Sequence, residues 1–133
     1  EYMEDYEISY YETNNRLLLT QNNLLEILQD LAIRHSDSLG YTLEVLGEDG
    51  KGWVLTNWHI VASSYPKCGE KIKVKTWSSS CRRLQAERSF TIENESGESI
   101  ICAVSRWVFM DLTRRRPTPI PKEMEDKYYC GID

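Results

Sequence analysis

The side chains best suited to hydrolytic chemistry lie at the start of a helix that the sequence predicts from residue 20. Glu26 comes one turn inside this helix and could act as a general base, with Asn14 or Asn15 nearby to orient a water molecule. The free N–H groups at Thr20–Asn23, at the positive end of the helix dipole, could stabilise negative charge. The same residues also fit a capped helix with a solvated acid, so both interpretations stay open.

The helix is predicted to run from Thr20, a suitable N-cap, to about Ser36, before Gly40. His35 projects along its apolar stripe near the C-terminus, where it is either a buried, satisfied histidine or a catalytic one. The stripe itself consists of Leu24, Leu25, Ile27, Leu28, Leu31 and Ala32.

A second group of polar side chains falls in a predicted strand. We expect His59 to point to the same face as Trp53 and Asn57, because side chains two residues apart share a face of a strand. This face either lines a ligand tunnel, with Asn57 and His59 as polar contacts, or belongs to the core.

The elements that position these residues are mostly strands. One tyrosine-rich stretch covers 6–13, and residues 40–52 form a loop or short strand. Four further strands are predicted at 53–63, 71–78, 84–93 and 100–112. Only one helix is available to cover the apolar face of their sheet. The order therefore predicts an α+β hotdog fold, with a curved antiparallel sheet of five to six strands wrapped around one long central helix.

We expect this single hotdog domain to cover residues 1–112. The segment 113–133 contains Pro117, Pro119 and Pro121, and proline at alternate positions cannot continue a sheet ladder. It is therefore predicted to be an extended, Pro- and Arg-rich exit segment or linker.

Length, charge and cysteine usage narrow the classes of function. The 133 residues fit one domain, and a net charge of −5 argues against nucleic acid as the main partner. Apolar runs are too short to cross a bilayer, so no membrane partner is expected. The four cysteines form no CxxC pair and have no histidine at metal-ligand spacing. We therefore expect a cytoplasmic protein with free thiols, no metal and no cofactor.

Four stretches resemble the acyl-ACP thioesterase family. The family's first strand and central helix are similar to YEISYYETNN and LLEILQDLAIRHSDSLG. Its central hairpin is similar to GWVLTNWHIVASSYPKCGEKIKVKTW, and its last strand and exit to SRWVFMDLTRRRPTPIPKE. The turn Tyr65-Pro66…Gly69 is a fairly specific part of this likeness. Family members are tandem hotdogs, and this chain resembles the N-terminal one.

The resemblance implies hydrolysis of the thioester that joins a fatty acyl group to the phosphopantetheine arm of acyl carrier protein. The family's catalytic Asp-x-Asn-x-His cluster belongs to the second hotdog and does not occur here, because Leu55 stands where an acid is needed before Asn57 and His59. What carries over is the acyl pocket. We expect it between the helix residues Leu24, Leu28 and Leu31 and the strand face that contains Trp53.

Segregated charge indicates a possible surface for the acidic carrier protein. Arg114, Arg115 and Arg116 lie in a segment without acids, and a second basic region covers 67–83, whereas residues 1–12 carry five acids and no base. The alternative is a solvated strand face and an ordinary basic linker. The chain is expected to pair with a second hotdog domain or to form a homodimer.

Two other functions stay open. The chain could be a non-catalytic module that binds the acyl chain or the carrier protein, or a stand-alone homodimeric acyl-CoA thioesterase in which Glu26 is the base.

Overall fold

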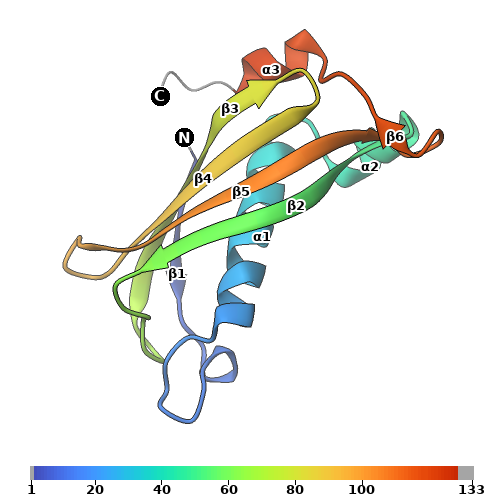
Figure 1. Cartoon of the computed structure of the whole chain (residues 1–133). Coiled ribbons are helices and arrows are strands. Elements are labelled where there is room, and N and C mark those ends of the chain that lie inside the picture. The colour runs from blue at the N-terminus through green and yellow to red at the C-terminus, as the bar shows by residue number, and fades with distance from the viewer. Residues whose placement is uncertain (1, 129–133) are drawn as a thin grey trace.

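A computed structural model describes residues 2–128, in which one antiparallel sheet curls around one long helix (Figure 1). The sheet follows the order β1-β3-β4-β5-β2, and a short strand β6 pairs with β5. The strands are β1 (Tyr2–Glu7), β2 (Lys51–Ala62), β3 (Lys71–Arg82), β4 (Gln85–Glu93), β5 (Ser99–Asp111) and β6 (Arg116–Pro117). The long helix, α1 (Gln21–Ser38), lies against the concave face. This arrangement confirms the predicted hotdog fold.

Helix α1 begins where its N-cap predicts. The hydroxyl of Thr20 accepts a hydrogen bond from the backbone N–H of Asn23 at 3.2 Å and so satisfies one of the free donors of the first turn. The stripe that faces the sheet is buried, with Leu24 and Leu28 at 0% exposure. His35 is buried on the same stripe, so the sequence placed it on the correct face.

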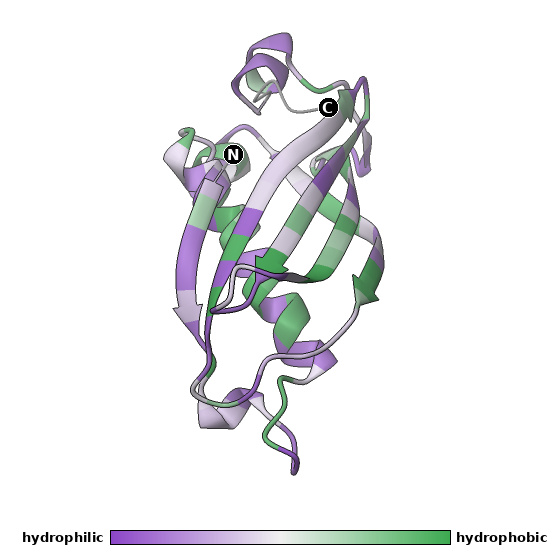
Figure 2. Ribbon diagram, turned by 90° about the vertical axis from the view of Figure 1, so that its left-hand side faces the viewer, coloured by the Kyte–Doolittle hydropathy of each residue, from purple (hydrophilic) through white to green (hydrophobic). Residues whose placement is uncertain are grey.

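Alternation of side chains positions the strands of the sheet. Ile72 and Val74 of β3 point inward and are buried, whereas Lys71 and Lys73 are exposed. Figure 2 shows such alternation of hydrophobic and hydrophilic residues along several strands. Strand β5 lies between β4 and β2, which fits its apolar character on both faces.

A β-bulge in β2 overturns one prediction. Leu55 pairs with Trp107 and Asn57 with Arg106, so Thr56 is an extra residue in the ladder. The alternation reverses after it, and the inward side chains become Trp58 and Ile60. The expectation that Asn57 and His59 share a face with Trp53 is therefore wrong, and both side chains are exposed on the convex side.

Two local elements differ from their predictions near the N-terminal half. The first strand ends at Glu7, and residues Tyr10–Glu12 form a 3₁₀ turn because the carboxylate of Glu12 accepts hydrogen bonds from the N–H and the hydroxyl of Ser9, at 2.9 Å each. The segment expected to be a loop or short strand contains a helix, α2 (Leu43–Glu48). The hydroxyl of Thr42 caps α2 by accepting from the N–H of Val45 at 3.0 Å.

The exit segment packs on the domain and does not extend away from it. The prolines leave the N–H groups of the intervening residues free to bond: Thr118 donates to the carbonyl of Phe109 at 2.9 Å, and Ile120 donates to that of Arg83 at 2.6 Å. A third helix, α3 (Lys122–Tyr128), follows, with Met124 and Tyr128 buried. The part of the predicted linker after Tyr128 lies outside the described residues.

The interior contains two hydrophobic clusters. The larger, which we call the sealed cluster, joins the first half of α1 to the inward residues of β3, β4 and β5. The smaller, which we call the upper cluster, joins α2, β5 and the segment around α3 through Leu46, Phe109, Ile120, Met124 and Tyr128.

Within residues 2–128, no helix is long and apolar enough to cross a membrane. The same residues hold no group of three or more His, Cys, Asp or Glu side chains placed to bind a metal ion.

Candidate functional site

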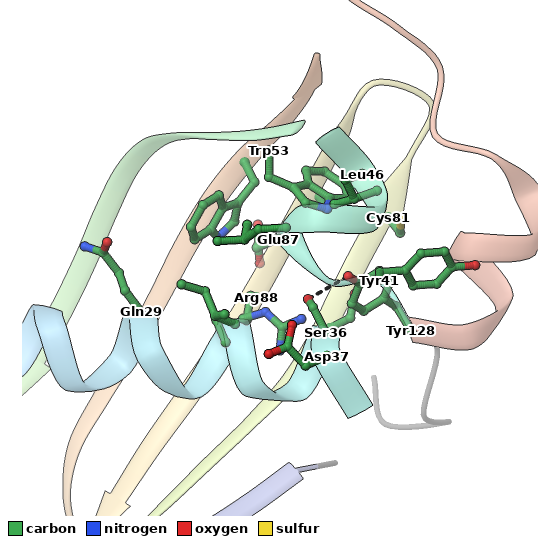
Figure 3. Close-up of a pocket in the computed structure, with 16 residues that line it drawn as sticks. Gln29, Ser36, Asp37, Tyr41, Leu46, Trp53, Cys81, Glu87, Arg88 and Tyr128 are labelled. Carbon is green, nitrogen blue, oxygen red and sulfur yellow. Dashed lines mark hydrogen bonds between the residues drawn. The ribbon is translucent and has the colours of Figure 1, made fainter. Parts of the chain in front are cut away.

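A cavity of about 250 Å³ lies beside the upper cluster, between the C-terminal half of α1, helix α2 and the concave face of the sheet (Figure 3). Its walls are mostly apolar, which is typical of a site for a hydrophobic ligand. Lining residues from α1 and α2 are Gln29, Ala32, Ile33, Ser36, Asp37, Leu43 and Leu46. The other lining residues are Tyr41, Trp53, Ser78, Cys81, Ala86, Glu87, Arg88, Trp107 and Tyr128.

An aromatic wall closes one side of the cavity. The ring of Trp53 packs against Phe109, with 4.9 Å between ring centres, and lies edge-on to Tyr128 at 6.4 Å. Tyr128 also stacks on Tyr41 at 5.8 Å. Large rings from β2, α3 and the loop before α2 thus present apolar surface together, supported by Phe109 of β5 against Trp53, and the phenol and indole groups keep polar edges.

A band of polar residues forms the boundary between the cavity and the sealed cluster. Ser78, Arg88 and Ser105 are cross-strand neighbours on the concave face. The hydroxyl of Thr76 accepts a hydrogen bond from Nη1 of Arg88 at 3.1 Å. With His35 of α1, these are all five of the buried polar side chains in residues 2–128. Buried polar groups are stable only when they are hydrogen-bonded, so hydrogen bonds hold side chains of this band in place. The band therefore separates the cavity from the sealed cluster.

The charge state of His35 follows from its partners. Nη1 of Arg88 lies 2.8 Å from Nδ1 of His35, and a guanidinium can only donate, so Nδ1 accepts and the imidazole is neutral. Burial, and then the charge of Arg88, lower the pKa of His35 to about 4. The ring stacks on Tyr2 at 5.3 Å between centres. His35 is therefore a buried acceptor held by Arg88.

The predicted acyl-binding residues divide between the cavity and the core. Trp53 lines the cavity. Leu24, Leu28 and Leu31 do not, because they are enclosed in the sealed cluster with at most 1% exposure. The residues of α1 that face the cavity belong to its later turns. The structure therefore places the cavity nearer the C-terminus of the helix than we expected from the leucines.

Asn14 and Glu26 are the two residues proposed for catalysis. Within residues 2–128, no hydrogen bond or ion pair joins them. Asn14 stabilises its own loop, because its side-chain oxygen accepts from the N–H of Arg16 at 2.8 Å and from that of Leu18 at 3.2 Å. Glu26 is exposed on α1, one turn before Gln29 on the same side of the helix. Neither lines the cavity, and their catalytic role stays a prediction.

Comparisons with known proteins place the chain in a family. Residues 1–128 match the family described as the acyl-ACP thioesterase N-terminal domain. The chain belongs to this family. It is 30% identical over 130 residues to a palmitoyl-acyl carrier protein thioesterase of Gossypium hirsutum, and this alignment covers 92% of the chain. It is 25% identical over 134 residues to oleoyl-acyl carrier protein thioesterase 1 of Arabidopsis thaliana, and this alignment covers 96% of the chain.

A solved structure supports the same assignment. The acyl-ACP thioesterase of Bacteroides thetaiotaomicron superposes with a TM-score of 0.88 at 26% identity, over 98% of this chain and 55% of that one. The chain spans only about a third of the two plant relatives, 32% and 37%. The acyl-ACP thioesterase domain described here is therefore one part of the length that these relatives have.

Among the lining residues of this acyl-ACP thioesterase domain that were not predicted, Arg88 and Tyr128 are buried. Arg88 precedes Phe90 and Ile92 at alternate positions, so the period of the strand already directs its side chain inward. Tyr128 follows Met124 by four residues, which is helical spacing, and Pro121 stands directly before the helix. Both signals were present in the sequence.

The predicted docking surface is exposed. Arg114, Arg115 and Arg116 follow β5, and the side chain of Asp111 organises this turn by accepting the N–H groups of Thr113 and Arg114 at 3.1 Å each. These two bonds and the nearby Lys51 lower the pKa of Asp111.

The second basic region is partly offset by the sheet, because three of its six bases lie beside acids. β1 pairs with β3 so that Asp5 lies opposite Lys73 and Glu7 opposite Lys71. Lys75 forms an ion pair with Glu93 at 2.9 Å. The acids of β1 therefore offset the lysines of β3, and the three arginines after β5 remain the stronger candidate for binding an acidic partner.

Proposed function

We propose that this chain is the acyl-binding domain of an acyl-ACP thioesterase. The whole protein hydrolyses the thioester between a fatty acyl group and the phosphopantetheine arm of acyl carrier protein, and it releases the free fatty acid. The observation that carries the proposal is the apolar cavity lined by Trp53, in a chain that belongs to the acyl-ACP thioesterase family.

The cavity suits binding better than cleavage. Its lining carries apolar side chains such as Ala32, Leu46 and Trp107, which favour burial of a hydrocarbon chain. The buried base next to the cavity, His35, accepts a hydrogen bond from Arg88, and a guanidinium is not a group that a base can activate as a nucleophile. The chain therefore holds the substrate, and the residues that activate water come from a second hotdog domain.

An edge of the sheet supports pairing with that second domain, in the same polypeptide or in a second copy. β2 is an edge strand, and its outward residues Val54 and Val61 are exposed. An unpaired edge with exposed apolar side chains favours association with another sheet.

The carrier protein docks, in this proposal, on Arg114, Arg115 and Arg116. Acyl carrier protein is acidic, and three exposed arginines attract it at low salt. Arg114 lies 4.0 Å from Asp111, at the limit of an ion pair, and its side chain is 68% exposed.

Incubation of the full-length protein with acyl-ACP tests the proposal directly. We expect release of free fatty acid, measured by mass spectrometry, and little release from residues 1–133 alone. Absence of release from the full-length protein contradicts the proposal. Hydrolysis of acyl-CoA by residues 1–133, abolished by Glu26→Gln, would instead establish the stand-alone homodimer. The cytoplasmic location stays a prediction, and the names of the plant relatives place those proteins in the chloroplast.

A further inference from the structure

Tyr128 lies in the segment that was predicted to be a linker, but its side chain makes several contacts with the rest of the domain. Its hydroxyl shares a hydrogen bond with Ser36 of α1 at 2.7 Å. Its ring stacks on Tyr41, lies edge-on to Trp53, and receives the guanidinium of Arg88 at 5.6 Å from its centre. One side chain of α3 thus contacts α1, β2, β4 and the loop before α2.

Exposure distinguishes the opening of the cavity from its inner end. Ile33, Asp37 and Leu43 line the cavity and are exposed, so they mark the side that opens to solvent. Tyr128 and Arg88 line it and are buried, at 5% and 8% exposure. The phenol ring and the guanidinium therefore belong to the buried side of the cavity, and a chain that enters from the exposed side meets them inside it. Figure 3 shows Tyr128 hydrogen-bonded to Ser36 beside Arg88.

Two features keep the ring in this place. Ile120 and Met124 anchor the segment before it in the upper cluster. The ring itself is clamped between Tyr41 and the guanidinium of Arg88. Neither feature involves a residue of the sealed cluster, so we expect that cluster to keep its packing when the ring is removed.

We propose that the ring of Tyr128 is the stop that sets the length of acyl chain accepted by the cavity. The inference rests on the proposed function, because it assumes that the cavity holds an acyl chain. A ring at the inner end occupies space that the last carbons of a longer chain would need. The segment after β5 is thereby part of the acyl site, and its aromatic residue determines specificity.

The test measures binding and does not depend on hydrolysis. Saturated acyl chains of 6 to 18 carbons, joined to pantetheine by an amide that cannot be hydrolysed, are titrated into the full-length protein by calorimetry. We expect Tyr128→Ala to move the optimum to longer chains, by up to about five carbons, because an aromatic side chain buries at least roughly 150 Å² and a methylene roughly 30 Å². Tyr128→Leu should move it in the same direction by less.

Two controls separate ring volume from other effects. Tyr128→Phe keeps the ring and loses the bond to Ser36, and it should keep the wild-type optimum. Met124→Ala weakens the packing of α3 without touching the cavity, and it should keep that optimum too. An equal shift in either control overturns the inference, because helix position and not the ring would then set the length.

The two proposals fail in different ways. If no chain in the series binds the wild-type protein, the acyl-binding function itself is wrong. If the wild type binds with a clear optimum and folded Tyr128→Ala and Tyr128→Leu share it, or bind no chain at all, only the role of Tyr128 as a stop is wrong.

Discussion

The sealed cluster and the upper cluster use the same helix and the same sheet, yet one is filled and the other borders a cavity. In the first half of α1 the inward side chains are leucines that meet Val74, Phe90 and Ile92 of the sheet. In the last turns the helix presents His35 and Ser36. Small and polar side chains leave space between helix and sheet that the leucines would have filled.

The boundary between the two clusters shows that the cavity is not a defect of packing. Ser78, Arg88 and Ser105 form a continuous row across three strands, and His35 meets them from the helix. In residues 2–128, the indole N–H of Trp58 is the one buried side-chain donor or acceptor without a hydrogen-bond partner. The comparison teaches that the filled half stabilises the domain, whereas the other half has the polar and aromatic side chains of a binding site.

The largest effect should come from the filled half. Leu28 is at 0% exposure in the sealed cluster, and Leu28→Ala should lower the free energy of unfolding by about 2–5 kcal/mol, through lost transfer energy and a new cavity. Urea unfolding followed by circular dichroism measures this. Ile33→Ala, on the cavity side of the same helix, is the matched control and should cost less than about 1 kcal/mol, because Ile33 is 37% exposed. Equal losses would show that the two halves do not differ in stability.

The free energy of unfolding should depend on pH through His35, which lies in the boundary between the two clusters. His35 has a pKa of about 4 in the folded state, against an ordinary value of 6.5, so the unfolded state binds more protons between these values. The free energy of unfolding should therefore fall as pH falls from about 6.5 to about 4, by up to about 2 kcal/mol. Arg88, Tyr2 and Tyr128 are the ionisable groups recorded against the ring, and Arg88 opposes its protonation.

Denaturant unfolding at pH 7 and pH 4.5 tests this dependence. His35→Gln should flatten it, whereas His59→Gln, on the exposed convex face, should keep the wild-type slope because it keeps His35. If His35→Gln retains the full slope, the boundary does not contain the group that titrates.

The cavity half should show its effect in ligand binding. Trp53→Ala removes an aromatic wall and should weaken binding of amide-linked acyl-pantetheine about tenfold and change the preferred chain length, at a smaller loss of stability than Leu28→Ala. Trp77→Ala is the matched control, because Trp77 lies between the inward Thr76 and Ser78 and points to the convex face. Unchanged affinity and length preference in Trp53→Ala would remove this residue from the site.

The parts of the fold that follow from periodicity could be predicted from the sequence. Thr20 caps α1 where the apolar spacing begins, and the four strands from Lys51 to Asp111 occur close to their expected bounds. These predictions succeed because alternation and helical spacing are local and because only one long helix covers the sheet.

The other features depend on pairing between strands and on packing across the core, which the spacing of residues along the chain does not show. The bulge at Thr56 is set by pairing with β5, and it reverses the face of Asn57 and His59. The position of the cavity depends on which turns of α1 meet small residues across the core. By contrast, the helix at Met124 and Tyr128 was hidden only because the prolines before it indicated a linker, and its spacing could have been recognised.

The smallest effect is expected at Arg115. Glycine would suit the backbone at this turn better, but it would remove a positive charge from the surface. Arg115 adopts a φ of 55°, a left-handed conformation for which the chain uses glycine at Gly69 and Gly97. Arg115→Gly should relieve strain and raise the free energy of unfolding by about 0.5 kcal/mol after the greater entropy of the unfolded chain is counted. It should also raise the KM for acyl-ACP at low salt, because it removes one of the proposed docking charges.

A matched variant at the other end of the molecule isolates the charge. Leu17 has a φ of 61° in an exposed loop that precedes α1, so Leu17→Gly gives a similar backbone relief without changing charge. We expect it to leave the KM unchanged. The pair is compared by thermal unfolding and by KM at two salt concentrations. If Arg115→Gly raises stability and leaves the KM and its salt dependence as in the wild type, the strain at this turn has no connection with carrier binding, and the docking surface must lie elsewhere.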